Sequence, residues 1–262
     1  ILGCLLHRGL GDVYKGQVRD ALEFIRSRVD IELNAVTDNP LLFCEDEAVI
    51  SGGNFHGEPM ALPFDFLGIA CAELASISER RIERMVNAAL SNGLTRFLTT
   101  NGGVNSGFMI VQYAAASMVS AHTHPPQPAS VLPRPPPVPP ASLASENKVL
   151  AHPASVDSIP SSANQEDFVS MGTTAARKAG PILENTRSVL AYELLTACQA
   201  IDIRRRTGTY GEGLSPVGEA VYRRVRQEVD FMEEDRELWP DIRAVEVLVR
   251  SGELLDLAEA LV

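Results

Sequence analysis

Cysteine is scarce in this sequence, and its spacing excludes two common uses. The 262 residues include four cysteines, Cys4, Cys44, Cys71 and Cys198, with no Cys-X-X-Cys pair. No Cys/His spacing typical of zinc is present either, so we predict neither a disulfide framework nor a metal site. Reduced thiols and a cytoplasmic location are expected instead.

Positive charge and long apolar runs are also in short supply. Lys and Arg number 23 against 34 Asp and Glu, which gives a net charge of -11 and disfavours binding to nucleic acid or to an anionic membrane. No apolar run approaches the ~20 residues of a membrane-spanning helix, and the start lacks the order of a signal peptide. We expect a globular protein whose ligand is a small neutral or zwitterionic molecule.

Strand-like alternation is rare, which excludes an all-β fold. Apolar residues recur at three- and four-residue spacing and predict helices over 67–85, 108–120 and 173–201. The helix at 108–120 is apolar on every side and is expected to be buried all round. Ser215 and Pro216 form an N-cap and first-turn pair for a further helix, and another follows from Asp241. With one short hairpin near 41–51, the predicted class is mainly α, a bundle of long helices.

A proline-rich run interrupts this helical pattern. Nine of the sixteen residues from 125 to 140 are proline, and proline cannot continue a helix because it lacks a backbone N–H and has a fixed φ. The flanking stretches AASMVS (115–120) and PASLAS (140–145) nearly repeat each other. We therefore interpret 121–145, which contains His122 and His124, as a disordered or artefactual insert that splits one helix. A linker between domains and a ligand for SH3 or WW domains are the alternatives.

Several polar motifs have simple structural interpretations. The charges of SERRIER (78–84) predict a solvated or interface face of a helix. GGVNSG (102–107) lacks the ending of a phosphate-binding loop, and we interpret it as a turn into a helix capped by Asn105 or Ser106. His56 and His152 have no partners at metal-ligand spacing and are expected to be hydrogen-bonded packing residues.

Six longer stretches occur in an order that composition does not explain. They are ELNAVTDNP (32–40), ISGGNFHGEP (50–59), SERRIER (78–84), GGVNSGFMI (102–110), SENKVLAHPASVDS (145–158) and SSANQEDFVSMG (161–172). Together they resemble the C-terminal half of the aromatic amino acid lyases, and within that family the ammonia-lyases that act on histidine. The resemblance covers 16–120 and 146–262 as one helical domain and leaves 1–15 outside it.

This resemblance implies a fold and a reaction. The fold is a long-helix bundle of the lyase and aspartase type, in a homotetramer whose active sites are shared between subunits. The reaction is the non-oxidative elimination of ammonia from L-histidine to give trans-urocanate. The family uses a tyrosine base and an electrophilic prosthetic group, 4-methylideneimidazol-5-one, formed from an internal Ala-Ser-Gly. This sequence contains no Ala-Ser-Gly, so we assign it no catalytic residue and expect the chain alone to be inactive.

The resemblance also implies which residues bind the substrate. Phe55 corresponds to an aromatic wall of the pocket, and Glu166 to the acidic residue that faces the substrate side chain. A carboxylate can accept an imidazole N–H, whereas a phenyl ring offers a desolvated anion no partner. Asn39, Asn54 and Gln165 are weaker candidates for ordering polar groups around the amino acid.

Three alternatives stay open. Phe168 stands where the histidine enzymes commonly have histidine, which leaves room for a tyrosine or phenylalanine ammonia-lyase or an aminomutase. The fumarase and aspartase group shares the architecture, but its signature loop needs a lysine that SSANQED lacks. A non-catalytic fragment that joins tetramers is the third alternative, and Glu166 and Asp167 are then an exposed acidic pair.

Overall fold

A computed structural model describes residues 10–119, 144–208 and 213–261. Residues 1–9 of the predicted N-terminal stretch and 121–143 of the predicted insert, with His122 and His124, lie outside the described residues. The elements in chain order are α1 (Leu10–Glu32), β1 (Leu41–Phe43), β2 (Ala48–Ile50), α2 (Glu58–Val86), η1 (Arg96–Leu98), α3 (Met109–Val119), α4 (Ala144–Leu150), η3 (Ser162–Asn164), α5 (Gly172–Thr207), α6 (Pro216–Glu228), α7 (Trp239–Ser251) and α8 (Glu253–Glu259). The predicted mainly α class is confirmed.

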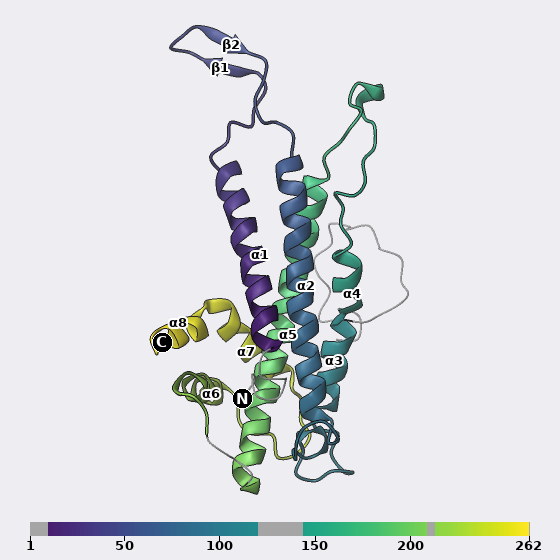
Figure 1. Cartoon of the computed structure of the whole chain (residues 1–262). Coiled ribbons are helices and arrows are strands. Elements are labelled where there is room, and N and C mark those ends of the chain that lie inside the picture. Colours follow the sequence, from purple (N-terminus) through teal and green to yellow (C-terminus); the bar gives the residue numbers. More distant parts are fainter. Residues whose placement is uncertain (1–9, 120–143, 209–212, 262) are drawn as a thin grey trace.

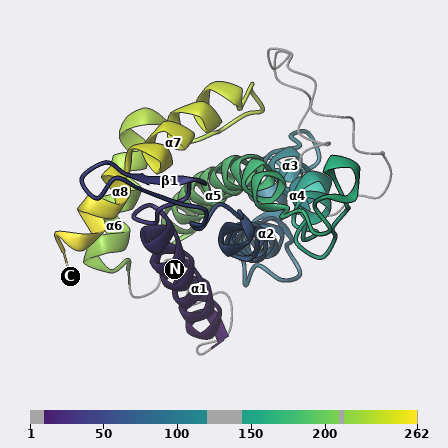
Figure 2. The same cartoon turned by 90° about the horizontal axis from the view of Figure 1, so that it is seen from above.

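Two long helices, α2 and α5, form the axis of the molecule. Their 29 and 36 residues make them about 44 and 54 Å long at 1.5 Å per residue. Figure 1 shows them side by side, with α1 against α2 on one side and α3 and α4 on the other. Helices α6, α7 and α8 lie beside the lower half of α5, on the side away from α3 and α4, as the view from above also shows (Figure 2).

The core lies where α2, α3 and α7 meet the middle of α5. Ile82, Met85, Phe108 and Leu195 are each no more than 1% exposed there. Removing such a side chain from water contributes about 1.5–3 kcal/mol, which is why the apolar stripes set the arrangement of these helices.

Both axial helices extend beyond the predicted limits. Helix α2 begins at Glu58 rather than at residue 67, because Pro59 in its first turn has a φ that suits a helix start, while Pro63 obscures the apolar period. Helix α5 continues six residues past Ile201. Its last turn is rich in arginine, and cationic side chains stabilise a helix at its C-terminus because the helix dipole is negative there. It ends at Gly208, whose φ is 69°.

The apolar character of α2 exceeds the sequence-based expectation. By length and composition this helix would suffice to cross a membrane, although no run of that kind was predicted. Its buried face nevertheless packs on α5 and includes the charged residues Asp65 and Glu79. Charged residues on a buried face are almost always paired, so this face is typical of a helix in the core of a protein.

The solvated face predicted for SERRIER is found only in part, because Arg80 is exposed whereas Glu79 and Arg81 contact neighbouring helices. Glu79 is 0% exposed and accepts a hydrogen bond from Gln112 of α3 at 3.1 Å. Arg81 donates through two nitrogens to the carboxylate of Glu193 on α5. Glu79 and Arg81 therefore join α2 to α3 and α5.

The prediction that the helix at 108–120 is buried all round is wrong. Ile110 and Tyr113 of α3 are 57% and 60% exposed, while Val111 and Ala115 face the core. Helix α4 contacts both α3 and α5 and lies above α3 in the same column (Figure 1).

Two local predictions are confirmed. Strands β1 and β2 form an antiparallel hairpin in which Leu42 pairs with Val49. The Ser215 side chain caps α6 by accepting the backbone N–H of Gly218 at 3.1 Å, and Pro216 follows at the first helical position.

The predicted cap in GGVNSG is wrong. Helix α3 begins at Met109, and the backbone amides of Ser106 and Gly107 donate to the two carboxylate oxygens of Asp235 at 2.7 and 2.8 Å. An acidic residue from far along the chain therefore fixes this turn.

Candidate active site

The loops 50–57 and 158–171 meet where α2 and α5 begin. A Cβ atom at Gly172 would lie 2.5 Å from the carbonyl oxygen of Gly57, and one at Gly57 would lie 2.8 Å from the Ser170 hydroxyl oxygen. Only glycine fits such a close backbone approach. The close contact between the starts of α2 and α5 therefore holds the two loops next to each other.

A contact between rings joins the two sequence motifs directly. The His56 ring stacks on the Phe168 ring with centroids 6.1 Å apart and planes at 28°. Its Nε2 also lies 3.3 Å from the Phe168 carbonyl oxygen. The structure thus brings together ISGGNFHGEP and SSANQEDFVSMG, which are more than a hundred residues apart, and His56 has the predicted packing role.

Asn54 and Asn39 shape the first loop. The Asn54 side chain donates to the Glu32 carboxylate at the end of α1 at 2.7 Å. The Asn39 side-chain oxygen accepts the backbone N–H of Gly52 at 3.1 Å, and the Asn39–Pro40 peptide is cis. Both asparagines therefore already have structural partners in the chain, while their predicted ligand contacts stay predictions.

The second loop presents Gln165 and Glu166 at its tip. Ser161 and Glu166 exchange backbone hydrogen bonds of 2.8 and 3.3 Å, which closes the tip. Between them, residues 162–164 all have positive φ, an unusual run for residues other than glycine. The side chains of Gln165 and Glu166 point to the surface and are exposed.

The exposed ring of Phe55 lies on the neighbouring loop. It is 58% exposed, so in the described chain its face is open to a ligand or to other protein. That Phe55, Gln165 and Glu166 contact a substrate stays a prediction, since none of them lines the cavities of this structure described next.

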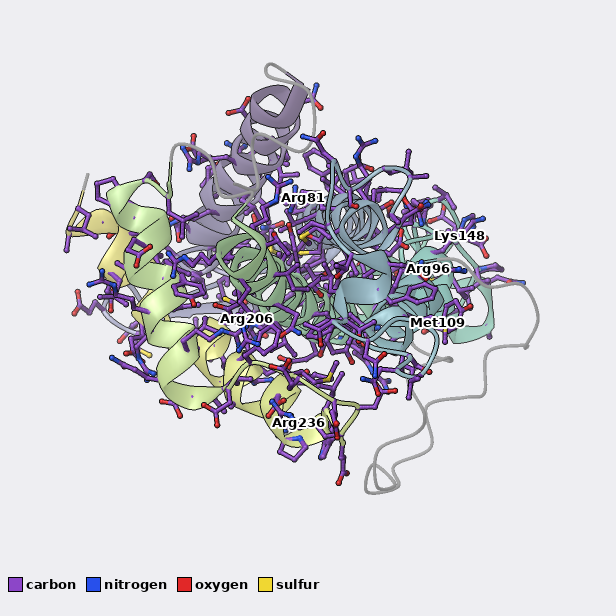
Figure 3. The ribbon with its side chains drawn as sticks, turned by 90° about the horizontal axis from the view of Figure 1, so that it is seen from below. Arg81, Arg96, Met109, Lys148, Arg206 and Arg236 are labelled. Carbon is purple, nitrogen blue, oxygen red and sulfur yellow. The ribbon has the colours of Figure 1, made fainter. Side chains whose placement is uncertain are left out.

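Two adjoining cavities lie at the other end of α2. Their volumes are about 450 and 570 Å³, and both are lined by Arg96, Phe97 and Met109. Arg96 and Met109 lie close together there in the view from below (Figure 3). The cavities belong to the GGVNSG end of the bundle, about one α2 length, roughly 44 Å, from the candidate site.

Sequence reasoning assigned no role to three residues that hold the second loop, Asp65 and Lys178 beneath it and Ser158 at its start. Asp65 is 5% exposed on α2, and its carboxylate accepts the Lys178 ammonium at 3.1 Å and the Ser155 amide at 2.7 Å. Burial acts to raise the pKa of Asp65, but the hydrogen bonds outweigh it and hold that pKa below the usual value. The signal was available as a charged residue inside the apolar run MALPFDFLGIA.

No group of three or more His, Cys, Asp and Glu residues that could hold a metal occurs within 10–119, 144–208 and 213–261. The sequence also contains no Ala-Ser-Gly, the tripeptide from which the resemblance implies that the prosthetic group forms.

Comparison with known proteins defines the class. The family model for aromatic amino acid lyases matches residues 13–136 and 135–227, and the chain belongs to that family. Within the family, it is 54% identical to the histidine ammonia-lyase of Symbiobacterium thermophilum over 94% of this chain and 42% of that protein. It is 52% identical to histidine ammonia-lyase 1 of Fusobacterium nucleatum over 93% of this chain and 42% of that protein.

Solved structures agree with these sequence matches. The histidine ammonia-lyase of Trypanosoma cruzi superposes with a TM-score of 0.78 at 42% identity, over 94% of this chain and 43% of that one. The tyrosine aminomutase of Streptomyces globisporus superposes with a TM-score of 0.77 at 36% identity, over 95% of this chain and 41% of that one. The long-helix bundle of the lyase family is thus confirmed, and the chain spans less than half the length of these relatives.

Proposed function

We propose that this chain is part of a histidine ammonia-lyase, which eliminates ammonia from L-histidine to give trans-urocanate. The observation that carries the proposal is identity of 52–54% to histidine ammonia-lyases over more than nine tenths of the chain. The loop that presents Glu166 supports it, because a carboxylate can accept an imidazole N–H.

In this proposal the chain binds and orients the substrate side chain. Glu166 accepts the imidazole N–H and stabilises positive charge on the ring, and Phe55 offers an aromatic face to it. Gln165, Asn39 and Asn54 are assigned to ordering the polar groups of the amino acid. The prosthetic group, when bound, supplies the electrophile that makes the amine a better leaving group.

The prosthetic group has to come from polypeptide other than this sequence, which contains no Ala-Ser-Gly. We propose that the N-terminal half of the family's protein supplies it, that this chain is inactive alone, and that the whole protein is a homotetramer whose active sites are shared between subunits. Exposed apolar residues on β1, β2 and α2 support such contacts, because patches of this kind mark interaction surfaces. They are Leu42, Phe43, Val49, Ile50, Leu62, Phe66 and Ile69. We propose the cytoplasm as location and neither nucleic acid nor membrane as partner.

The experiment is an assay of the protein produced from its complete gene. Histidine, tyrosine and phenylalanine are offered separately, and urocanate formation is followed by ultraviolet absorbance. We expect turnover of histidine, and a fall in kcat/KM of roughly 5- to 13-fold in Glu166→Gln, because the amide oxygen still accepts the imidazole N–H but lacks the charge that strengthens the bond by about 1–1.5 kcal/mol. Asp167→Asn is the matched control, since it removes a neighbouring charge that has no assigned contact.

One observation favours a second candidate. Phe168, next to the acidic pair, gives the site an apolar ring where the histidine enzymes commonly have histidine. A tyrosine or phenylalanine ammonia-lyase or an aminomutase fits that ring. Turnover of tyrosine or phenylalanine with no turnover of histidine would establish this candidate and reject the first.

A further inference from the structure

The loop that carries Glu166 has two legs, and they are held differently. Its second leg, residues 169–171, runs directly into α5 and is fixed by the contact between Gly57 and Gly172. Its first leg, residues 151–157, connects α4 to the loop, and three of these residues are exposed. Something must therefore fix the first leg to the bundle if the tip is to keep one position.

A buried ion pair provides this attachment. Asp65 of α2 and Lys178 of α5 lie 3.1 Å apart, with side chains only 4% and 19% exposed. Each has a second partner on the first leg. The Asp65 carboxylate accepts the Ser155 amide at 2.7 Å, and the Lys178 ammonium donates to the His152 carbonyl oxygen. The pair thus joins both axial helices to one short segment of backbone.

Above this attachment, Ser158 closes the neck of the loop. Its hydroxyl accepts the Val169 amide at 2.9 Å and donates to the Val169 carbonyl oxygen at 3.1 Å. The backbone bonds between Ser161 and Glu166 come next. Three separate sets of hydrogen bonds therefore follow one another along the loop, at the buried ion pair, at the neck and at the tip.

We propose that Asp65 and Lys178 are positioning residues, which hold the first leg, residues 151–157, in the position from which the loop presents Glu166 to the substrate. They touch no substrate and act through the Ser155 and His152 backbone. The inference rests on the proposed function for its last step, the role of Glu166. The mechanical step, from the ion pair to the loop, is independent of that function.

The low pKa of Asp65 supports this arrangement. A carboxylate whose amide and ammonium partners outweigh burial stays ionised at neutral pH, so it can hold both partners at once. Lys178 cannot be replaced by an apolar residue without leaving that anion buried and unpaired.

The mechanical step is tested by hydrogen exchange in the protein produced from its complete gene. In Lys178→Met we expect the amides of Ser155, Glu166 and Val169 to exchange at least about tenfold faster, because an opening easier by 1.4 kcal/mol is tenfold more populated. Lys178→Arg keeps the charge and should restore slow exchange. Unchanged exchange in Lys178→Met would overturn the proposal. If that variant does not fold, Asp65→Asn keeps the shape of the side chain and removes its charge from the pair, and unchanged exchange at Glu166 and Val169 in that variant would overturn the proposal equally.

The functional step is tested by kinetics with a matched control. Lys178→Met should raise KM for histidine about tenfold, with a smaller change in kcat, and Lys178→Arg should recover the KM. Arg81→Met is the control, since it breaks another buried ion pair between α2 and α5, with Glu193, away from the loop. It should lower stability and leave KM unchanged.

The outcomes separate the two proposals. Faster exchange in Lys178→Met together with an unchanged KM, in a protein that does turn over histidine, would overturn the positioning role. An equal rise in KM in Arg81→Met would overturn it too, because the effect would then follow stability. Faster exchange in a protein that never turns over histidine would support the attachment of the loop and reject the proposed function.

Discussion

Gln199 of α5 offers a sharp test of how the lower half of the bundle is held together. Its side chain is 1% exposed and lies between η1 and the segment that connects α6 to α7. The amide nitrogen donates to the carbonyl oxygens of Leu98 and Met232 at 3.2 and 2.8 Å, and the amide oxygen accepts the Met232 N–H at 3.1 Å. One buried amide thus fixes the end of η1 and the segment between α6 and α7.

Replacing Gln199 by leucine keeps the volume and removes all three hydrogen bonds. Each is worth about 1 kcal/mol net, so we expect the free energy of unfolding to fall by about 3 kcal/mol. At about 2–4 °C per kcal/mol for a chain of this size, the melting temperature should fall by roughly 6–12 °C. Differential scanning calorimetry on the purified protein measures both quantities.

Thr196→Val is the matched control on the same helix. Thr196 is 0% exposed, and its hydroxyl donates one hydrogen bond to the Tyr192 carbonyl oxygen within α5. We expect the free energy of unfolding to fall by about 1 kcal/mol or less, because the Tyr192 carbonyl oxygen keeps its backbone hydrogen bond within the helix. If Gln199→Leu lowers the free energy of unfolding no more than Thr196→Val does, the Gln199 amide does not join the two segments and the reasoning is refuted.

Three further outcomes are expected. Gly107→Ala should cost at least about 1–2 kcal/mol in a thermal melt, because φ is 54° and the new Cβ would lie 2.4 Å from the Phe97 carbonyl oxygen; an unchanged melt would show that the turn relaxes. Iodoacetamide should label exposed Cys44 under native conditions but spare Cys198, whose pKa burial raises to about 12, as peptide mass mapping will show. The pKa of Asp65 is lowered on folding, so its stabilisation is complete above about pH 3.8 and lost as pH falls through the folded value. Denaturation midpoints at pH 7 and pH 3 should therefore differ less in Asp65→Asn than in the unchanged protein, and equal differences would contradict this.

The parts of the fold that local sequence determines were predictable. The hairpin at β1 and β2, the Ser215 cap and the stripes of α2 and α5 each depend on residues close together in the chain. Their signals are turn chemistry, capping and period, which act over a few residues.

The buried ionic contacts were not predictable in the same way. Arg81 and Glu193 are 112 positions apart, and Asp65 and Lys178 are 113 apart, so no helical period relates them. A period assigns a charged residue to the polar face by default, and that is why SERRIER was assigned to a solvated or interface face. The partner of a buried charge is set by helix packing, which only the three-dimensional structure shows.

The candidate site was predictable as a pair of motifs but not as a pocket. Family resemblance singled out Phe55 and Glu166, and the structure brings their loops together through His56 and Phe168. What the motifs could not indicate is the mounting of the second loop on Asp65 and Lys178, because neither residue belongs to a motif with known chemistry.

A rigid base beneath an exposed tip has a physical consequence for selectivity. In the described chain the Glu166 carboxylate is exposed, and a hydrated anion needs no partner. When other polypeptide covers the site, that anion loses its water and must find a hydrogen-bond donor, which an imidazole N–H supplies and a phenyl ring does not. Under the proposed function, selectivity for histidine would then arise only on assembly, and its strength would depend on how little the loop can move to escape the cost of desolvation. A loop held by a buried ion pair at one leg and a helix start at the other leaves the carboxylate little freedom to turn back to water.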